Sequence, residues 1–263
     1  MLEMFGQSFI IRSSIVGLLI SVSAALVGTP LVLRRNAMIG DGLSHVGFGA
    51  FALATVLNLA PLEFALPVVI LMSFLILRLT GQSKIQPDAA IAMMSAGALA
   101  LGTFVISITR GVNTDINNYL FGSILSISNE DLILGIIFSI MMIGIFVICY
   151  NKIFALTFDE EFAKSVGVKT DLYNVIFAIL CSVVVVLGMR LMGALLISSL
   201  IIFPTMSAMQ IAKTFKKVTI ISVLISIICF VLGMFISYNL STPTGSTIVL
   251  VNLFVFLFCR ILR

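Results

Sequence analysis

Long apolar segments follow one another along almost the whole of this 263-residue chain. Runs of about 18 or more apolar residues recur, and at about 1.5 Å per residue each can cross a hydrocarbon core of about 30 Å as a helix. Only 10% of the residues are charged and the mean hydropathy is +1.25, whereas roughly a quarter of a soluble domain is charged. The sequence therefore predicts an all-α, polytopic transmembrane helix bundle with no soluble domain between the spans.

We predict eight or nine membrane spans within a single transmembrane domain that covers residues 1–263. The run from Leu172 to Ile211 would be about 60 Å long as one helix, twice the bilayer, so it must fold back on itself. The segment GMRLMG, residues 188–193, is the natural hairpin. With that hairpin the predicted spans are nine, at 10–33, 37–58, 62–77, 89–109, 132–150, 172–189, 191–211, 218–238 and 246–259.

Basic residues gather on one side of the membrane when these nine spans alternate. All but Arg12, Arg110 and Arg190 of the 15 Lys and Arg residues fall on that side. By the positive-inside rule it is the cytoplasmic side, so the C-terminus is predicted inside and the N-terminus outside. The short, mixed segment 115–128 is predicted to be an external loop or a partial re-entrant helix.

The segment GDGLSHVGFGAF, residues 40–51, places an acid and the chain's only histidine inside a predicted span. Asp41 and His45 are four residues apart, so their side chains share one face of a helix. Counted from Arg35 at the interface, they lie about 9 and 15 Å into the membrane, where ionisable groups are costly and usually functional. A carboxylate with an imidazole suits zinc or manganese. The alternative is a structural hydrogen bond between the two side chains.

Three further residues are candidates for an ion pathway. Asp88 opens a predicted span, where a carboxylate favours the helix N-terminus, so capping is its first interpretation and an exit ligand its second. Ser198 and Pro204 lie in the span 191–211. Pro204 removes a backbone hydrogen bond and can kink or break the helix, which would leave carbonyl groups for neighbouring helices or for an ion path.

The only long charged cytoplasmic segment lies at about 153–171 and contains LTFDEEFAKSVGVKTD. Apolar residues at helical spacing predict a short amphipathic helix, with Phe158, Phe162, Ala163 and Val166 on one side and Gly167 placed to end it. Helices that lie on lipid usually carry basic polar faces, whereas this one begins with acidic residues. We therefore predict that it docks on a cytoplasmic partner, through Phe158, Asp159, Glu160, Glu161, Phe162 and Gly167.

Five motifs, taken in order, resemble the permeases of bacterial metal-uptake ABC transporters, the ABC-3 family. MIGDGLSH resembles the G-D-x-x-S-H signature that follows an Arg-Arg pair, NNYLFGSILSIS the Y-L-F-G segment, LTFDEEFAKSVGV the F-D-E loop, MGALLISSLIIFPTMSA the G-x-L-L segment, and STPTGSTIVL the final small-residue stretch. The resemblance covers nearly the whole chain. After Pro204 the chain has Thr-Met-Ser where the family typically has Ala-Ala or Ala-Ser, which weakens any inference about ligands there.

The resemblance implies a homodimer that forms one translocation path in the bacterial cytoplasmic membrane. Two cytoplasmic ATPase subunits and an extracytoplasmic metal-binding protein would be its partners, with lipid around the bundle and no nucleic acid. Asp41 and His45 would coordinate Zn²⁺ or Mn²⁺ in transit, with zinc favoured, and residues 158–167 would dock on the ATPase. No cofactor is expected to be bound permanently.

The energy for transport must come from a partner if this interpretation is right. The sequence contains no G-x-x-x-x-G-K-[ST] phosphate-binding loop. The alternative function is a secondary metal transporter or channel that works without an ATPase. An enzyme is disfavoured because no nucleophile, base and orienting group are found together.

Overall fold

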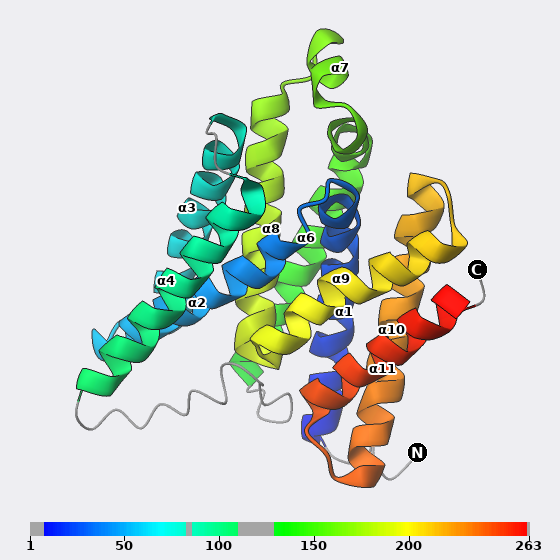
Figure 1. The fold of residues 1–263 in the computed structure, drawn as a ribbon. Helices are drawn as coiled ribbons and strands as arrows, with labels where there is room; N and C mark the ends of the chain where they lie inside the picture. The colour runs from blue at the N-terminus through cyan, green and yellow to red at the C-terminus, as the bar shows by residue number, and fades with distance from the viewer. Residues whose placement is uncertain (1–7, 83–85, 110–128, 262–263) are drawn as a thin grey trace.

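The computed structural model describes residues 8–82, 86–109 and 129–261, and every regular element within these ranges is a helix (Figure 1). The helices are α1 (Ser8–Leu33), α2 (Met38–Val56), α3 (Pro61–Gln82), α4 (Pro87–Ile108), α6 (Asn129–Phe158), α7 (Glu160–Ser165), α8 (Thr170–Met192), α9 (Ala194–Ile211), α10 (Phe215–Leu240) and α11 (Thr244–Ile261). The predicted all-α fold is confirmed. The motif NNYLFGSILSIS and the predicted loop or re-entrant segment 115–128 lie outside the described residues.

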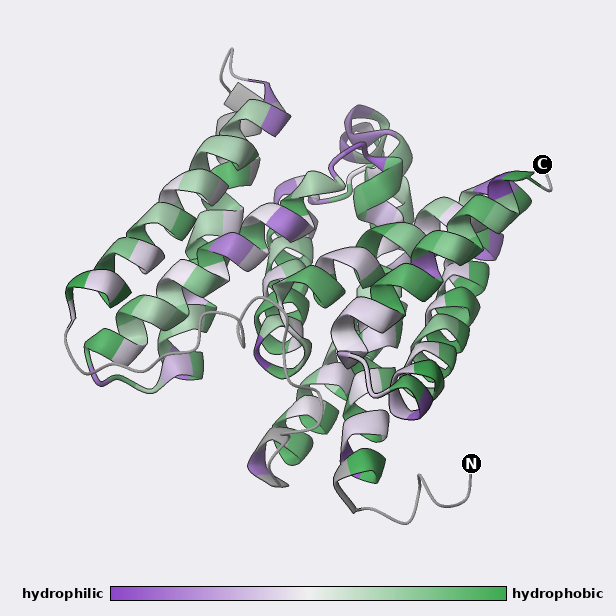
Figure 2. Cartoon of the chain, turned by 60° about the horizontal axis from the view of Figure 1, so that its bottom comes forward, coloured by the Kyte–Doolittle hydropathy of each residue, from purple (hydrophilic) through white to green (hydrophobic). Residues whose placement is uncertain are grey.

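Eight of the described helices are long and apolar enough to cross a membrane, namely α1, α2, α4, α6, α8, α9, α10 and α11. The apolar part of α3, Pro61–Ile76, is shorter. These helices correspond one to one, and in order, to the nine predicted spans. Figure 2 shows that they are hydrophobic over most of their length, with hydrophilic residues mainly near the helix ends.

Helices α1, α2 and α8 are the most deeply buried of the candidate membrane spans. Their apolar windows are 78%, 72% and 78% buried, compared with 17% for α4 and 22% for α11. The outer helices therefore keep apolar side chains exposed, which suits contact with lipid or with another membrane protein. The burial of α2 matters because this helix carries Asp41 and His45.

The long run at 172–211 folds back at Gly193, as predicted. Gly193 has φ 90° and separates α8 from α9, a backbone conformation that glycine adopts without the Cβ penalty of other residues. The turn is sharper than the predicted segment 188–193. α8 continues helically to Met192, and Gly188 lies inside it where a Cβ would collide with Ile197 of α9. The glycine at 188 thus serves close packing of the two helices.

Helix α6 is longer than the predicted span 132–150, because it continues to Phe158. The predicted loop at 153–171 is therefore helical over its first part. The polar residues Asn151 and Lys152 lie inside this helix rather than beyond its end. The last turns are instead held by aromatic contacts, since the rings of Phe154 and Phe158 lie 5.3 and 6.1 Å from that of Phe215 on α10.

The ends of the helices fall into two groups that match the alternation used for the topology prediction. Figure 1 places α7, the α1–α2 turn and the α9–α10 turn toward one end of the molecule. The α8–α9 and α10–α11 turns lie toward the other end. The first group is the end that the sequence predicts to be cytoplasmic.

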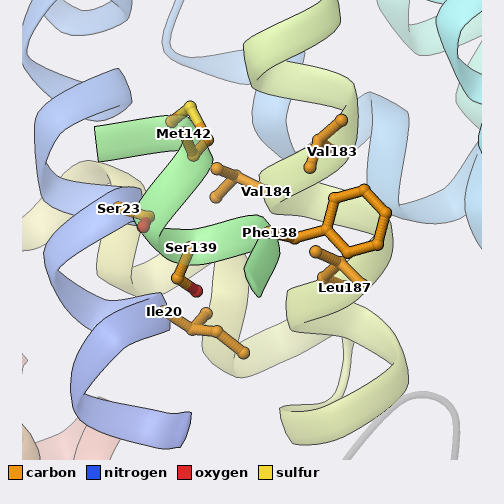
Figure 3. Close-up of a pocket in the computed structure, with 8 residues that line it drawn as sticks. All are labelled: Ile20, Ser23, Phe138, Ser139, Met142, Val183, Val184 and Leu187. Carbon is orange, nitrogen blue, oxygen red and sulfur yellow. The ribbon is translucent and has the colours of Figure 1, made fainter. Parts of the chain in front are cut away.

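A small cavity of about 10 Å³ lies between α1, α6 and α8 (Figure 3). Among the residues that line it, only Ser23 and Ser139 are polar, and the Ser23 hydroxyl donates to the Leu19 carbonyl oxygen of its own helix at 2.9 Å. An apolar cavity without a charged or imidazole ligand has no chemistry for a metal ion. The candidate metal ligands Asp41 and His45 lie outside this cavity.

The contact between α1 and α9 leaves no room for a side chain at position 28. A Cβ on Gly28 would collide with the carbonyl oxygen of Ile201, so Gly28→Ala must push the two helices apart. We expect it to destabilise the protein by about 1–3 kcal/mol and to lower its melting temperature in detergent. The matched control is Gly144→Ala, since a Cβ at Gly144 meets nothing within 4 Å. Equal melting temperatures for the two variants would contradict this packing.

Candidate functional site

The α1–α2 turn determines where α2 begins and so where Asp41 lies. Arg35 has φ 61°. The Arg35 N–H donates to Val32 at 3.0 Å and the Asn36 N–H to Leu31 at 2.9 Å, the hydrogen-bond pair of a Schellman motif. α2 then starts at Met38 with Asp41 in its first turn. A carboxylate is electrostatically favoured at that end of a helix.

Asp41 and His45 form the one accessible face in the first part of α2. From Ile39 to Ala52 every other residue of the helix is buried. The side chains of Asp41 and His45 are 40% and 24% exposed, respectively. Ser44, which adjoins His45 in sequence, is fully buried, so it lies on a different face, as the helical spacing requires.

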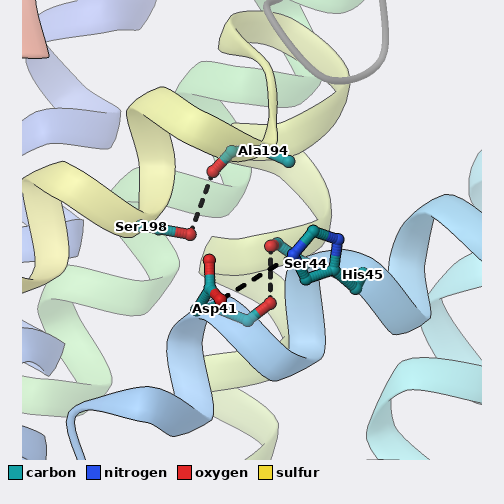
Figure 4. A network of polar contacts seen from close by, with 5 residues as sticks. All are labelled: Asp41, Ser44, His45, Ala194 and Ser198. Carbon is teal, nitrogen blue, oxygen red and sulfur yellow. Dashed lines mark hydrogen bonds and ion pairs between the residues drawn. The ribbon is translucent and has the colours of Figure 1, made fainter. Parts of the chain in front are cut away.

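The geometry of the pair favours a shared ligand over a direct hydrogen bond. His45 Nε2 and Asp41 Oδ2 are 3.7 Å apart (Figure 4), which is too long for a hydrogen bond. Two ligand atoms each about 2.1 Å from a tetrahedral zinc ion lie about 3.4 Å apart. The side chains are therefore spaced almost as they would be around one ion. The structural hydrogen bond of the alternative interpretation is not formed.

The other nitrogen of His45, Nδ1, is buried and has no hydrogen-bond partner within the described parts of the chain. An unpaired buried polar atom costs about 1–3 kcal/mol, and such atoms call for an explanation in a folded protein. A group outside this chain, such as water or a second protein, can supply the missing partner. The described part of the chain therefore leaves this nitrogen unpaired.

Helix α9 supplies the wall opposite Asp41. Gly40 lies against α9, because a Cβ there would be 3.0 Å from Ile201 Cδ1. Figure 4 shows Ser198 of α9 across from the Asp41 carboxylate. The Ser198 hydroxyl donates to the Ala194 carbonyl oxygen at 3.0 Å, so its oxygen keeps lone pairs available as an acceptor. Ser198 is 8% exposed and borders the site rather than filling it.

The other two pathway candidates are not part of this constellation. Asp88 is exposed in the first turn of α4, after the N-cap residue Gln86. Its position is that of a charge favoured by the helix N-terminus, and it is not the N-cap itself. Pro204 is buried within α9, which runs without a break from Ala194 to Ile211. Across the described ranges, no group of three or more His, Cys, Asp or Glu residues could hold a metal ion.

Helix α7 is a short helix with well-defined ends. Asp159 is its N-cap and accepts the Phe162 backbone N–H at 2.8 Å. Gly167, with φ 84°, follows the helix, and the Val168 N–H donates to the Ala163 carbonyl oxygen at 3.0 Å. These are the features of a glycine-terminated helix. The predicted helix and its end at Gly167 are present.

The faces of α7 differ from those predicted. Ala163 is fully buried, whereas Phe162 is 62% and Val166 60% exposed, so these residues do not share one face. Phe158 belongs to the end of α6, with its ring against those of Phe154 and Phe215. The side of α7 that packs against the rest of the protein carries the small side chain of Ala163 instead of the large apolar ones. Two large apolar side chains are left exposed at the tip of the molecule.

Sequence reasoning missed Asn174, a polar residue near the start of α8. Its side chain contacts both Glu160 of α7 and Arg34 at the end of α1. An amide within a predicted membrane span could have attracted attention, but its two partners are far away in the sequence. Burial lowers the pKa of Arg34 and the nearby Glu160 charge opposes that shift. Arg34 nevertheless stays charged at physiological pH.

A comparison with known proteins identifies the family. The model of the family described as ABC 3 transport family matches residues 6–263. The chain belongs to the ABC 3 transport family. This ABC 3 protein is 31% identical to the manganese import system permease protein ScaB of Streptococcus gordonii, over 95% of this chain and 89% of ScaB.

Two further relatives of this ABC 3 protein agree with that assignment. It is 30% identical to the high-affinity zinc uptake system membrane protein ZnuB of Buchnera aphidicola subsp. Acyrthosiphon pisum, over 93% of this chain and 94% of ZnuB. The structure of PsaBC from Streptococcus pneumoniae in complex with Fab matches with a TM-score of 0.85 at 28% identity, covering 96% of this chain and 91% of that chain. The ABC-permease fold and the multi-pass location in the cytoplasmic membrane are confirmed.

Proposed function

We propose that this chain is the membrane-spanning permease subunit of an ATP-driven importer of a divalent transition metal ion. The observation that carries the proposal is the Asp41 and His45 pair, which is the accessible face of an otherwise buried helix segment. Membership of the ABC 3 family and the names of ScaB and ZnuB support the same function. The chain is thus a transport subunit rather than an enzyme.

The metal ion is the cargo, and Asp41 and His45 are its two proposed ligands from this chain. Their carboxylate and imidazole suit zinc, which accepts both oxygen and nitrogen donors, better than manganese, which prefers oxygen. Zinc is therefore the first candidate. Manganese is the second, because ScaB is named for it. Within the described ranges no group of three or more acidic, thiol or imidazole ligands is found, which favours further ligands from water or from a second copy in a homodimer.

Energy for transport is proposed to come from a separate cytoplasmic ATPase that docks on α7. Phe162 and Val166 are large apolar side chains exposed at that position, beside the acidic residues Glu160 and Glu161. A binding protein outside the membrane would deliver the ion. ATP-driven changes between outward-facing and inward-facing states would then carry the ion past Asp41 and His45.

Uptake into proteoliposomes tests this function. The permease is purified together with its ATPase subunit and reconstituted into vesicles that contain ATP. Radiolabelled zinc and manganese are then added outside, together with the binding protein. We expect nearly all uptake to require ATP, and unlabelled zinc to inhibit manganese uptake more than manganese inhibits zinc uptake. Uptake that persists without ATP and follows a proton gradient would instead establish a secondary transporter. Stronger inhibition by manganese would reverse the metal preference.

A further inference from the structure

Three side chains connect the start of α7 to the α1–α2 turn through α8. Arg34 Nη1 donates to Asn174 Oδ1 at 3.1 Å, and Asn174 Nδ2 donates to Glu160 Oε1 at 2.7 Å. Asn174 therefore uses both ends of its amide, one toward a cation and the other toward an anion. Glu160 and Arg34 are far apart in the sequence and meet only through this residue of α8.

Arg34 is attached firmly to α8 by two contacts. Its Nη1 donates to Asn174, and its Cζ lies 5.7 Å from the centre of the Phe177 ring, one turn after Asn174, a distance suited to a cation–π contact. Its Nε is buried without a hydrogen-bond partner among the described residues. A cavity of only about 10 Å³, with Asn36 and Ser73 on its wall, adjoins it. The α1–α2 turn is therefore packed closely against α8 and has to move with Arg34.

The same arginine is part of the segment that starts the metal-binding helix. Arg34 is followed directly by Arg35 of the Schellman turn, and the Ile39 N–H of α2 donates back to Asn36 at 3.1 Å. Asp41 lies seven residues beyond Arg34 in the sequence. A short, hydrogen-bonded turn transmits a displacement better than a flexible loop does. Movement of Arg34 is therefore expected to move the start of α2.

At its other end the chain of contacts begins on the proposed docking helix. Glu160 is the first residue of α7, next to the N-cap Asp159. Two residues later, Phe162 is exposed where an ATPase would bind. Since α7 is only six residues long, a force on its exposed face must also displace Glu160.

We propose that Glu160, Asn174 and Arg34 are positioning residues that transmit movement of α7 to the end of α2 that carries Asp41 and His45. This inference rests on the proposed function, because it requires an ATPase at α7. None of the three residues binds the ion. Their role is to link ATP hydrolysis to a change in the metal site. Their loss should therefore leave both ATP hydrolysis and metal binding in place but remove the coupling between them.

The amide at position 174 makes a specific prediction possible. In Asn174→Asp the new carboxylate still accepts from Arg34 but cannot donate to Glu160, and it repels that residue. In Glu160→Gln the side-chain carbonyl oxygen still accepts from Asn174, so the link stays closed. In the double variant the new amide at position 160 donates to the new carboxylate at position 174, which closes the link again with reversed polarity.

The experiment measures metal uptake per ATP hydrolysed by the reconstituted permease with its ATPase, using zinc as the probe. We expect N174D to lower this ratio about tenfold while ATPase copurification and ATP hydrolysis persist. N174D/E160Q should recover most of the wild-type ratio, and E160Q, which removes a charge from the proposed docking helix, is compared with it at equal amounts of bound ATPase. Asn151→Asp is the matched control, because Asn151 is an exposed asparagine in the last part of α6, the helix that precedes α7. It should leave the ratio unchanged.

The possible results separate this inference from the function on which it rests. A wild-type ratio in N174D, or a double variant as low as N174D, would overturn the link. Loss of the ATPase from N174D would also overturn it, because Asn174 would then act in docking rather than in transmission. Absence of ATP-dependent uptake by the wild-type protein would overturn the proposed function itself. A defect confined to N174D beside an active wild type bears on the link alone.

Discussion

Alanine at position 45 is expected to reduce metal uptake at least about a hundredfold while the protein remains folded in the membrane. His45 provides one of two proposed ligands from this chain, and even residues that only support a ligand cost about 10- to 100-fold when they are removed. Truncating a side chain that is 24% exposed leaves no large cavity. Uptake by proteoliposomes of equal protein content, compared with gel filtration of the same samples, measures the two effects separately.

Thr55→Ala provides a control for this prediction on the same helix. The Thr55 hydroxyl donates to the Phe51 carbonyl oxygen at 2.8 Å, and it lies more than two helical turns beyond His45. This variant should transport normally. His45→Asp extends the test, because an oxygen ligand should shift the preference from zinc toward manganese. Normal uptake by correctly inserted His45→Ala would refute the role of the imidazole in the pathway.

The substitution Phe162→Asp is expected to abolish the association of the permease with its ATPase. Phe162 is 62% exposed on α7, and burial of an aromatic side chain in a partner's pocket commonly contributes 2 kcal/mol or more to binding, about a 30-fold change in affinity. A charge placed in such a pocket adds a desolvation cost. The helix itself should persist, since the Asp159 cap bonds the backbone N–H of residue 162 and not its side chain. Copurification of the ATPase measures the result.

Ile261→Asp is the matched control for the docking surface. Ile261 is more exposed than Phe162, at 82%, and lies at the end of α11 on the side predicted to be cytoplasmic. The same substitution there should leave the ATPase bound. If both variants lose the ATPase, the effect reflects added charge rather than α7. If neither does, α7 is not the docking site.

Helix positions were predictable because hydrophobicity alone determines which segments can cross a membrane. The fold-back at Gly193 followed from the length of the run 172–211, and the shared face of Asp41 and His45 followed from helical periodicity. Helix ends were less predictable. The predicted span ended at residue 150, but α6 continues to Phe158, where aromatic side chains pack on Phe215.

The faces of α7 show the limit of periodicity in a short helix. Phe158, Phe162, Ala163 and Val166 have helical spacing, but the structure buries only Ala163 among them. A six-residue helix makes less than two turns, so contacts with its neighbours decide its orientation more strongly than its own pattern does. For the same reason the sequence could not reveal that Glu160 points to Asn174.

The sequence by itself determined that this chain is a bundle of membrane helices, and that its one histidine shares a helix face with an acid inside an apolar segment. Both follow from local rules, namely residue hydropathy and the spacing of a helix. Only the tertiary structure decided that this face stays open while the rest of the helix is buried, and that Arg34, Asn174 and Glu160 meet. Those facts depend on contacts between distant segments, where close packing and paired polar groups select one arrangement among many that the same helices could form.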